Sequence, residues 1–370
     1  MQKEQQSIES QLQMARPRRH EIKRIPLTSE EKEFLGKIMD KAVAAEKAGD
    51  LKEALDLYTD YKNELLKIKE IKEIRERVKE SEKSLELEKQ YKDQVEILKK
   101  NGLIEKLPSG ELGFIDINGQ ARPIPTYKDI LKRVEAKKEL LEKKKEQGFT
   151  QLLLVPFGMK LINIAGKAKE LILKKYKQGN LKGINGDLLK LKEKKGMKEP
   201  ISIAVKYADA DISGDLVYYP EKFEQNDHGG KTKKEILEET DGWDVMFIED
   251  LPDLPAQGKG KTIGGRKQLE ASKSPEQYLE KMQTDPQYIG ESGMTPEAEL
   301  VYFMHYLQKN NQVIDDWQGG GKISWNLGGC FKNNRVCCSD WTRQAEQMRL
   351  EWYRPYHLGK DRGVRVGIKI

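Results

Sequence analysis

The chain has 370 residues and a formal net charge of +6; 35% of its residues are charged and 37% are hydrophobic, and its mean hydropathy is −0.77. No apolar run approaches the roughly 18 residues of a membrane span, and the polar N-terminus lacks the apolar stretch of a signal peptide. We therefore expect a cytoplasmic protein without a membrane-spanning segment.

The first hundred residues predict helices. Residues 1–28 are polar and basic and predict a disordered tail. Thr28 or Ser29, followed by Glu31, forms a capping signature for a helix that ends at Gly49-Asp50. A second helix follows from Leu51, and residues 64–100, which contain no Gly or Pro, predict a long amphipathic helix. We expect residues 29–101 to form a helical hairpin and a long helix that packs on the hairpin or in a coiled coil.

Residues 102–148 predict a small connector. The stretch ELGFIDINGQARPIP favours a β-hairpin that turns at Asn118-Gly119. A charged helix over 126–147 ends at Gly148, where we place the main domain boundary.

The remaining residues, 149–370, predict a mixed domain and thus an α+β fold class. Short apolar strands are expected at 149–159 and 242–252, a helix at 160–178, and a helix that Thr295 caps. The last fifty residues break into β-like pieces: SWNLGGCF, VCCSDW, MRLEWY and GVRVGIKI. The final piece alternates apolar and polar residues, and we expect it to pair with the strand at 150–155.

Catalytic and metal motifs are weak throughout. GKGKTIGGRK and HGGKTKK lack the first glycine of a phosphate-binding loop. His305 is on a helix without a ligand partner at useful spacing, so a packed or exposed role is favoured over catalysis. Cys330, Cys337 and Cys338 show neither zinc spacing nor a disulfide pattern, which favours reduced thiols. We expect no enzyme activity, no cofactor and no metal.

Large aromatic side chains gather near the C-terminus, in EWYRPYHLGK at 351–360. Pro355 and Gly359 interrupt regular structure there, so the segment cannot bury all of these side chains. Tyr, Trp and Arg dominate binding hot spots because they offer large contact areas with hydrogen-bonding groups. We therefore interpret this segment as a binding surface, whereas Trp325 and Trp341 are assigned to the core.

A set of further motifs supports a family resemblance. They are TQLLLVPFGMKL, DLVYYPEKF, HGGKTKKEIL, GWDVMFIEDLPDLP, GKTIGGRKQLEA, YLEKMQTDPQY, ESGMTPE, NQVIDDWQGGG and GVRVGIKI. With these motifs, residues from about 150 to 370 resemble the variable proteins of diversity-generating retroelements, of the type common in small-genome candidate-phylum bacteria.

The resemblance implies a C-type lectin-like domain over 149–370, in the version shared with formylglycine-generating enzymes. In such a domain the first and last strands pair, two main helices pack beside them, and a small mixed or antiparallel sheet presents a diversified face, here at about 336–362. Diversified, ligand-binding residues are then expected at Cys338, Asp340, Thr342, Gln344, Ala345, Glu351, Trp352, Tyr353, Arg354, Tyr356, His357 and Leu358. Scaffold positions are expected at Trp341, Arg343, Gln347, Arg349, Leu350, Pro355, Gly363, Val364 and Arg365.

Our leading hypothesis is a ligand-binding protein whose C-terminal face binds a macromolecule, most readily a protein, while the N-terminal helices self-associate or contact other components. One alternative is an oxidase of the formylglycine-generating kind that uses Cys330 with Cys337 or Cys338. A second is nucleic-acid binding through residues 331–370, which hold nine Lys/Arg against four Asp/Glu. We rank nucleic acid below a protein ligand and expect no membrane partner.

Overall fold

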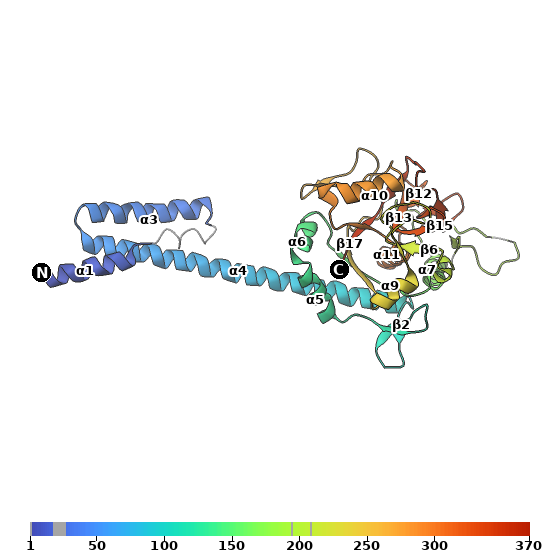
Figure 1. Cartoon of the computed structure of the whole chain (residues 1–370), viewed down its shortest axis with the longest axis horizontal. Helices are drawn as coiled ribbons and strands as arrows, with labels where there is room; N and C mark the ends of the chain where they lie inside the picture. The colour runs from blue at the N-terminus through green and yellow to red at the C-terminus, as the bar shows by residue number, and fades with distance from the viewer. Residues whose placement is uncertain (1, 18–26, 194, 208) are drawn as a thin grey trace. The chain divides into compact units, whose positions relative to one another are not determined.

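The protein is described by a computed structural model that covers residues 2–17, 27–193, 195–207 and 209–370. It divides into two compact units, Met1–Glu86 and Leu87–Ile370, and its secondary structure is mixed α+β (Figure 1). No helix in these ranges is long and apolar enough to cross a membrane.

Three helices form the first unit: α1 (Gln2–Ala15), α3 (Ser29–Lys47) and the first part of α4 (Leu51–Lys100). The expected capping box at the start of α3 is confirmed, because Thr28 and Glu31 exchange side-chain-to-backbone hydrogen bonds. The helices bury a small cluster between them, formed by Leu12, Ala42, Ala45, Ala54 and Tyr58.

Two sequence expectations change in this unit. Residues 2–15 form a helix rather than a disordered tail, because Leu12 finds apolar neighbours on the other helices; residues 18–26 of that prediction lie outside the described residues. The second hairpin helix and the long helix are one continuous element, α4, of 50 residues.

The second unit begins with the end of α4 and the connector. Strands β1 (Glu105–Lys106), β2 (Leu112–Ile115) and β3 (Ala121–Pro123) form an antiparallel sheet, so the hairpin is confirmed. Its turn closes on the Asp116 carboxylate, which accepts backbone N–H bonds from Asn118 and Gln120 at 2.8 Å.

The expected helix at 126–147 is two helices, α5 (Tyr127–Ala136) and α6 (Lys138–Glu146), because the backbone of Lys137 leaves the helical region. The sequence analysis placed the main domain boundary at Gly148, and this residue lies inside the second compact unit. Gln94 of α4 explains part of this: it donates to the carbonyl of Leu152 at 2.9 Å and so ties α4 to the sheet.

A four-stranded sheet follows in the order β11-β17-β8-β4. Its members are β4 (Gln151–Val155), β8 (Asp244–Ile248), β11 (Ser292–Gly293) and β17 (Val366–Lys369). The expected pairing of the last strand with 150–155 is wrong, because β8 lies between them and pairs with both. The apolar DVMFI run of β8 is mostly buried, and a central place supplies neighbours on both edges.

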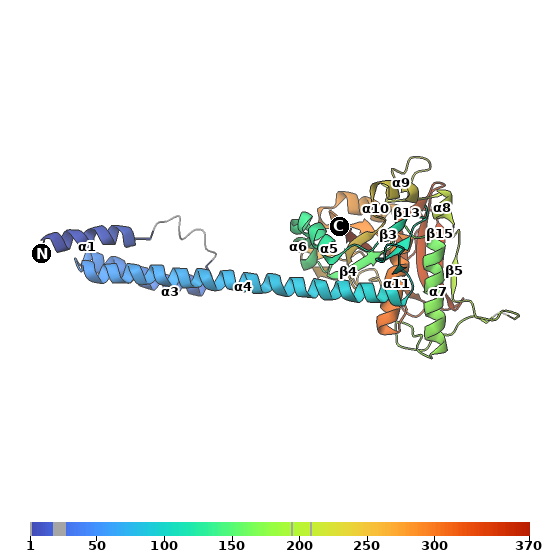
Figure 2. The same ribbon diagram turned by 90° about the horizontal axis from the view of Figure 1, so that it is seen from below.

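Helices α7 (Leu161–Lys177) and α11 (Pro296–Asn310) pack on each other beside this sheet (Figure 2). Both were expected, and Thr295 caps α11 by accepting the N–H of Ala298. His305 of α11 is buried, and its ring lies 3.0 Å from the Gln94 amide.

The larger sheet has the order β5-β15-β14-β13-β6-β7. Its strands are β5 (Ile203–Val205), β6 (Leu216–Tyr218), β7 (Lys231–Thr232), β13 (Ile323–Phe331), β14 (Arg335–Thr342) and β15 (Gln347–Tyr353). In parallel, β12 (Asp316–Trp317) pairs with β14, and β16 (Arg362–Val364) with β13. The smaller elements are α8 (Ala210–Ser213), α9 (Lys233–Glu239), β9 (Thr262–Ile263), β10 (Arg266–Lys267), α10 (Pro275–Thr284) and the 3₁₀ turn Pro286–Tyr288.

Candidate ligand-binding face

Strand β15 separates a buried face of the large sheet from an accessible one. Met348, Leu350 and Trp352 are buried in the main core, whereas the residues between them are half-buried. Successive side chains of a strand point to opposite faces, so Gln347, Arg349, Glu351 and Tyr353 share the accessible face. We call this accessible face, together with loop 354–361, the outer face.

Strand β14 contributes to the same outer face through its register with β15. Cys338 lies opposite Glu351, and Asp340 lies opposite Arg349. Thr342 follows two residues later, so these three side chains of β14 point to one side, as their alternation predicts. All three are nevertheless buried.

Long side chains from neighbouring segments cover these residues of β14. The Arg362 guanidinium reaches to 3.6 Å from the Cys338 sulfur, and Arg349 donates to both carboxylate oxygens of Asp340, at 2.9 and 3.1 Å. The accessible part of the outer face is therefore shifted to β15 and the loop after it.

Charged groups of alternating sign run across the outer face. Burial raises the pKa of Asp340 to about 6, against the opposing effect of the Arg349 guanidinium. Arg349 also lies over the Trp317 ring at 5.2 Å. Glu351 pairs with Lys206 at 3.0 Å and accepts the Tyr353 hydroxyl at 2.7 Å. The carboxylates on this surface thus already have partners.

An aromatic and cationic stack anchors the loop. Tyr353 and His357 are stacked with ring centroids 5.2 Å apart. The Arg362 guanidinium lies 4.1 Å from the Tyr353 ring and 4.9 Å from the Trp325 ring, and such cation–π contacts contribute about 0.5–2 kcal/mol each. The stack holds both ends of the loop against the sheet.

The tip of the loop is exposed. Tyr356 is 67% exposed and Leu358 is 62% exposed, whereas Pro355 is buried. Large apolar side chains are therefore presented to water on a backbone whose neighbouring residues are fixed.

The twelve expected binding residues fall into three groups. The buried ones are Cys338, Asp340, Thr342 and Trp352; the half-buried ones are Ala345, Glu351 and Tyr353; the exposed ones are Gln344, Arg354, Tyr356, His357 and Leu358. Only the last two groups can contact a partner without rearrangement.

Trp352 corrects the sequence interpretation most clearly. It is on the inner face of β15, where its ring packs on Phe331 at 4.3 Å and its Nε1 donates to the carbonyl of Lys206 at 2.9 Å. The sequence placed Trp352 in an irregular segment, but β15 continues to Tyr353, and strand alternation turns Trp352 inward.

The expected scaffold residues are mainly interior. Trp341, Leu350, Pro355, Gly363, Val364 and Arg365 are buried, and Arg343, Gln347 and Arg349 are half-buried. Arg343 bridges two carboxylates, those of Asp187 and Asp316, each at 2.6 Å. Gln347 and Arg349 belong to the outer face, which the resemblance did not imply.

Sequence reasoning missed three residues of this surface: Lys206, Trp317 and Arg362. Trp317 was visible as part of NQVIDDWQGGG, but its position beside β14 depends on a parallel pairing between distant segments. No local pattern indicates that pairing.

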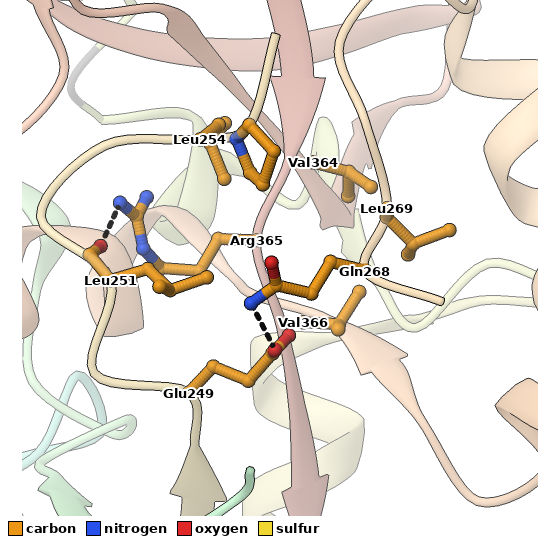
Figure 3. Close-up of a pocket in the computed structure, with 9 residues that line it drawn as sticks. Glu249, Leu251, Leu254, Gln268, Leu269, Val364, Arg365 and Val366 are labelled. Atoms are coloured by element: carbon orange, nitrogen blue, oxygen red, sulfur yellow. Dashed lines mark hydrogen bonds between the residues drawn. The ribbon is translucent and has the colours of Figure 1, made fainter. Parts of the chain in front are cut away.

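A narrow cavity lies beneath β16 and β17, between residues of several loops (Figure 3). Its wall includes Gln268, hydrogen-bonded to Glu249 at 3.0 Å, and Arg365, which donates to the carbonyl of Leu251 at 2.8 Å. Its volume of about 10 Å³ is close to the minimum for one water molecule. This cavity is too small for an organic ligand.

The three cysteines are free and buried. Burial raises the pKa of Cys330 and of Cys338 to about 12, and it also raises the pKa of Cys337. Within the described parts of the chain, no group of three or more His, Cys, Asp or Glu side chains is arranged to hold a metal ion.

The chain thus has a mixed α+β fold, and its outer face combines polar and aromatic side chains. No family model, curated protein or solved structure matches the chain.

Proposed function

We propose that the protein binds a protein ligand through the outer face, as a variable protein of the diversity-generating retroelement type with a C-type lectin-like domain, and that it acts in the cytoplasm. The observation that carries the proposal is the exposed pair Tyr356 and Leu358 on a loop whose base is fixed by the stack of Tyr353, His357 and Arg362.

In this arrangement, the residues exposed at the tip of the loop are different from the residues that hold the fold together. The exposed loop residues make few contacts that the fold needs, and surface substitutions typically change stability by no more than about 0.5 kcal/mol. The buried residues beneath them, such as Trp341 and Leu350, provide the core that holds the strands in place. Side chains at the tip can therefore change while the framework persists.

A macromolecular ligand suits the surface better than a small molecule. Exposed Tyr and Leu side chains at the tip of a loop offer contact area to a large partner, whereas small ligands need concave pockets of about 300 Å³ or more. The cavity below β16 and β17 is far smaller.

Neither alternative hypothesis gains support at the C-terminus. An oxidase needs an accessible thiolate, and burial raises the pKa values of all three thiols. A nucleic-acid surface needs accessible cations, and four of the nine in residues 331–370 are already paired with carboxylates: Arg343, Arg349, Arg365 and Lys369.

We also propose that the first unit self-associates. Phe34, Leu66 and Ile71 expose about half of their surface on α3 and α4, and exposed apolar surface can mark a protein–protein contact. Light scattering of the full chain should then give a multiple of 42.6 kDa, and a monomer at 50 μM would reject this part.

The proposal of diversification is tested by sequencing. The coding segment for 336–362 should have a second copy that differs at adenines, next to a reverse transcriptase gene. Among independent isolates, codons 344, 354, 356 and 358 should vary while those of Trp341 and Leu350 stay constant. Variation spread evenly over the segment would refute the proposal.

Binding capacity is tested with two libraries of the full chain displayed on yeast. One library randomises Gln344, Arg354, Tyr356 and Leu358, and a matched control randomises four exposed positions of α5, namely Lys128, Leu131, Lys132 and Glu135. Selection on biotinylated lysozyme should yield micromolar or tighter binders from the first library alone. Equal yields, or none from the first library, would contradict a binding role.

A further inference from the structure

The strongest concentration of positive charge lies in residues 160–199, apart from the outer face. This segment holds 12 Lys and no Arg against four acidic residues, a net charge of +8, whereas the whole chain carries +6. The rest of the chain is therefore slightly negative, and the segment is the main source of the protein's basic character.

Helix α7 orders the first half of these lysines. Its apolar residues, among them Ile164, Ala168 and Ile172, are buried. Lys169, Lys174 and Lys177 are exposed on the opposite side, and Lys174 and Lys177 are one helical turn apart, about 5 Å along the axis.

The second half of these lysines lies in the segment after α7. Backbone bridges join Lys182 to Leu188 and Lys192 to Ile201, so this stretch is held in β-like turns. The exposed cations here are Lys190, Lys192, Lys195 and Lys198. We call these four lysines and the three exposed ones of α7 the lysine surface.

Most of this charge is uncompensated. In the described ranges, Lys177 pairs with Glu199 at 3.1 Å across exposed surface, whereas Lys169 and Lys174 pair with no carboxylate. The cations of the C-terminal segment differ, because Arg343, Arg349 and Arg365 are held by carboxylates. Exposed cations without a carboxylate partner in the described ranges, such as Lys332 and Lys360, remain in the C-terminal segment, but the net charge is larger over 160–199, at +8 against +5.

The lysine surface also contains a hollow. A groove of about 680 Å³ lies beside the helix. Its lining includes three lysines, Lys169, Lys174 and Lys177, and two glutamates, Glu170 and Glu199. An open groove with more cations than carboxylates in its lining fits an extended polyanion.

We propose that the lysine surface binds the phosphodiester backbone of nucleic acid without reading its sequence. Lysine ammonium groups act as point charges toward phosphates, and phosphate contacts alone carry no sequence information. The segment offers no Arg for bidentate base contacts, and its one aromatic residue, Tyr176, is half-buried.

An anionic membrane is the main competing partner. Leu188 and Met197 are exposed within the same segment, and apolar side chains beside lysines suit a lipid surface. The groove decides between them, because a strand can lie in a hollow that a flat bilayer cannot enter.

The test uses fluorescence anisotropy of the full chain with a labelled 25-base single strand and a 25-base-pair duplex, from 50 to 300 mM KCl. We expect micromolar binding at 50 mM that weakens steeply with salt. The triple variant Lys169→Glu/Lys174→Glu/Lys177→Glu should bind at least ten times more weakly, and the slope of log K against log salt should fall by about 2–3 for the duplex.

A matched control carries the same charge change on exposed helical lysines elsewhere, as Lys128→Glu/Lys138→Glu/Lys143→Glu. It should bind within about twofold of the unmodified chain. The neutral variant Lys169→Gln/Lys174→Gln/Lys177→Gln, which avoids new repulsion in α7, should also lose most of the affinity.

Three results would overturn the proposal: no binding at 50 mM KCl, equal losses in the test and control variants, or displacement of the duplex by vesicles with 30% phosphatidylserine at equal phosphate concentration. None of these results bears on the outer face, because the lysine surface shares no residue with it.

Discussion

Two aromatic residues four positions apart should respond very differently to the same substitution. Trp352 is 7% exposed, so almost all of its ring is removed from water. A buried aromatic side chain covers about 200 Å², and at about 25 cal/mol per Å² this burial contributes about 5 kcal/mol. Because the site relaxes in part, we expect Trp352→Ala to lower the free energy of unfolding by about 3–5 kcal/mol.

Tyr356 provides the matched comparison, since it is 67% exposed. Tyr356→Ala should change the free energy of unfolding by less than about 0.5 kcal/mol. The two variants remove side chains of similar size from the same C-terminal segment, so the difference between them measures burial.

Urea unfolding of the full chain, followed by tryptophan fluorescence, measures both effects. All five tryptophans lie between residues 243 and 352, so the signal reports the second compact unit alone, and four of them remain in Trp352→Ala. A loss below about 1 kcal/mol in Trp352→Ala, or a loss above 2 kcal/mol in Tyr356→Ala, would refute the assignment of inner and outer faces.

Three other predictions concern buried charge, pH and thiols. Arg365→Met should lower the free energy of unfolding in urea by about 3–5 kcal/mol, because it leaves Glu299 and Asp315 buried without their cation. An unchanged free energy of unfolding would contradict this buried ion-pair network. Burial lowers the pKa of His305 to about 4, so this residue should contribute about 3 kcal/mol of stability above pH 6.5 that is lost as the pH falls toward 4. Unfolding from pH 4.5 to 7.5 should show that loss in the unmodified chain and not in His305→Gln. Because burial raises the thiol pKa values, Ellman's reagent should react with no cysteine of the native chain within minutes and with all three in guanidinium; rapid labelling of Cys338 would reopen the oxidase hypothesis.

Local signals predicted much of the fold. The cap at Thr28, the turn at Asn118-Gly119 and the proline after Thr295 are each determined by neighbouring residues, and the structure contains all three. The strands at 151–155 and 244–248 were also expected, because short apolar runs bounded by turn residues are typical of buried strands.

Features that depend on distant residues were not predictable in this way. The position of β8 between β4 and β17 depends on how strands from distant parts of the chain pair, and the sequence of one strand does not indicate it. The inward direction of Trp352 depends on where β15 ends, since a strand that stopped one residue earlier would leave its direction open. Trp317 joins the outer face only through its pairing beside β14.

The lysine surface was not predicted from the sequence, for a different reason. Positive charge also gathers in the last forty residues, where carboxylates hold some of the cations, among them Arg349 and Arg365. A count over 160–199 would have found a larger excess, and only the structure distinguishes paired cations from free ones.

The two-residue period of β15 sets which kinds of mutation its segment can absorb. A substitution at Glu351 changes the outer face and one at Leu350 changes the core, so single replacements stay confined to one side of the sheet. Inserting or deleting one residue between 347 and 353 would move every later side chain to the opposite side, carrying carboxylates into the interior and apolar groups out to water. This stretch of the gene should therefore accumulate altered codons while keeping its length unchanged.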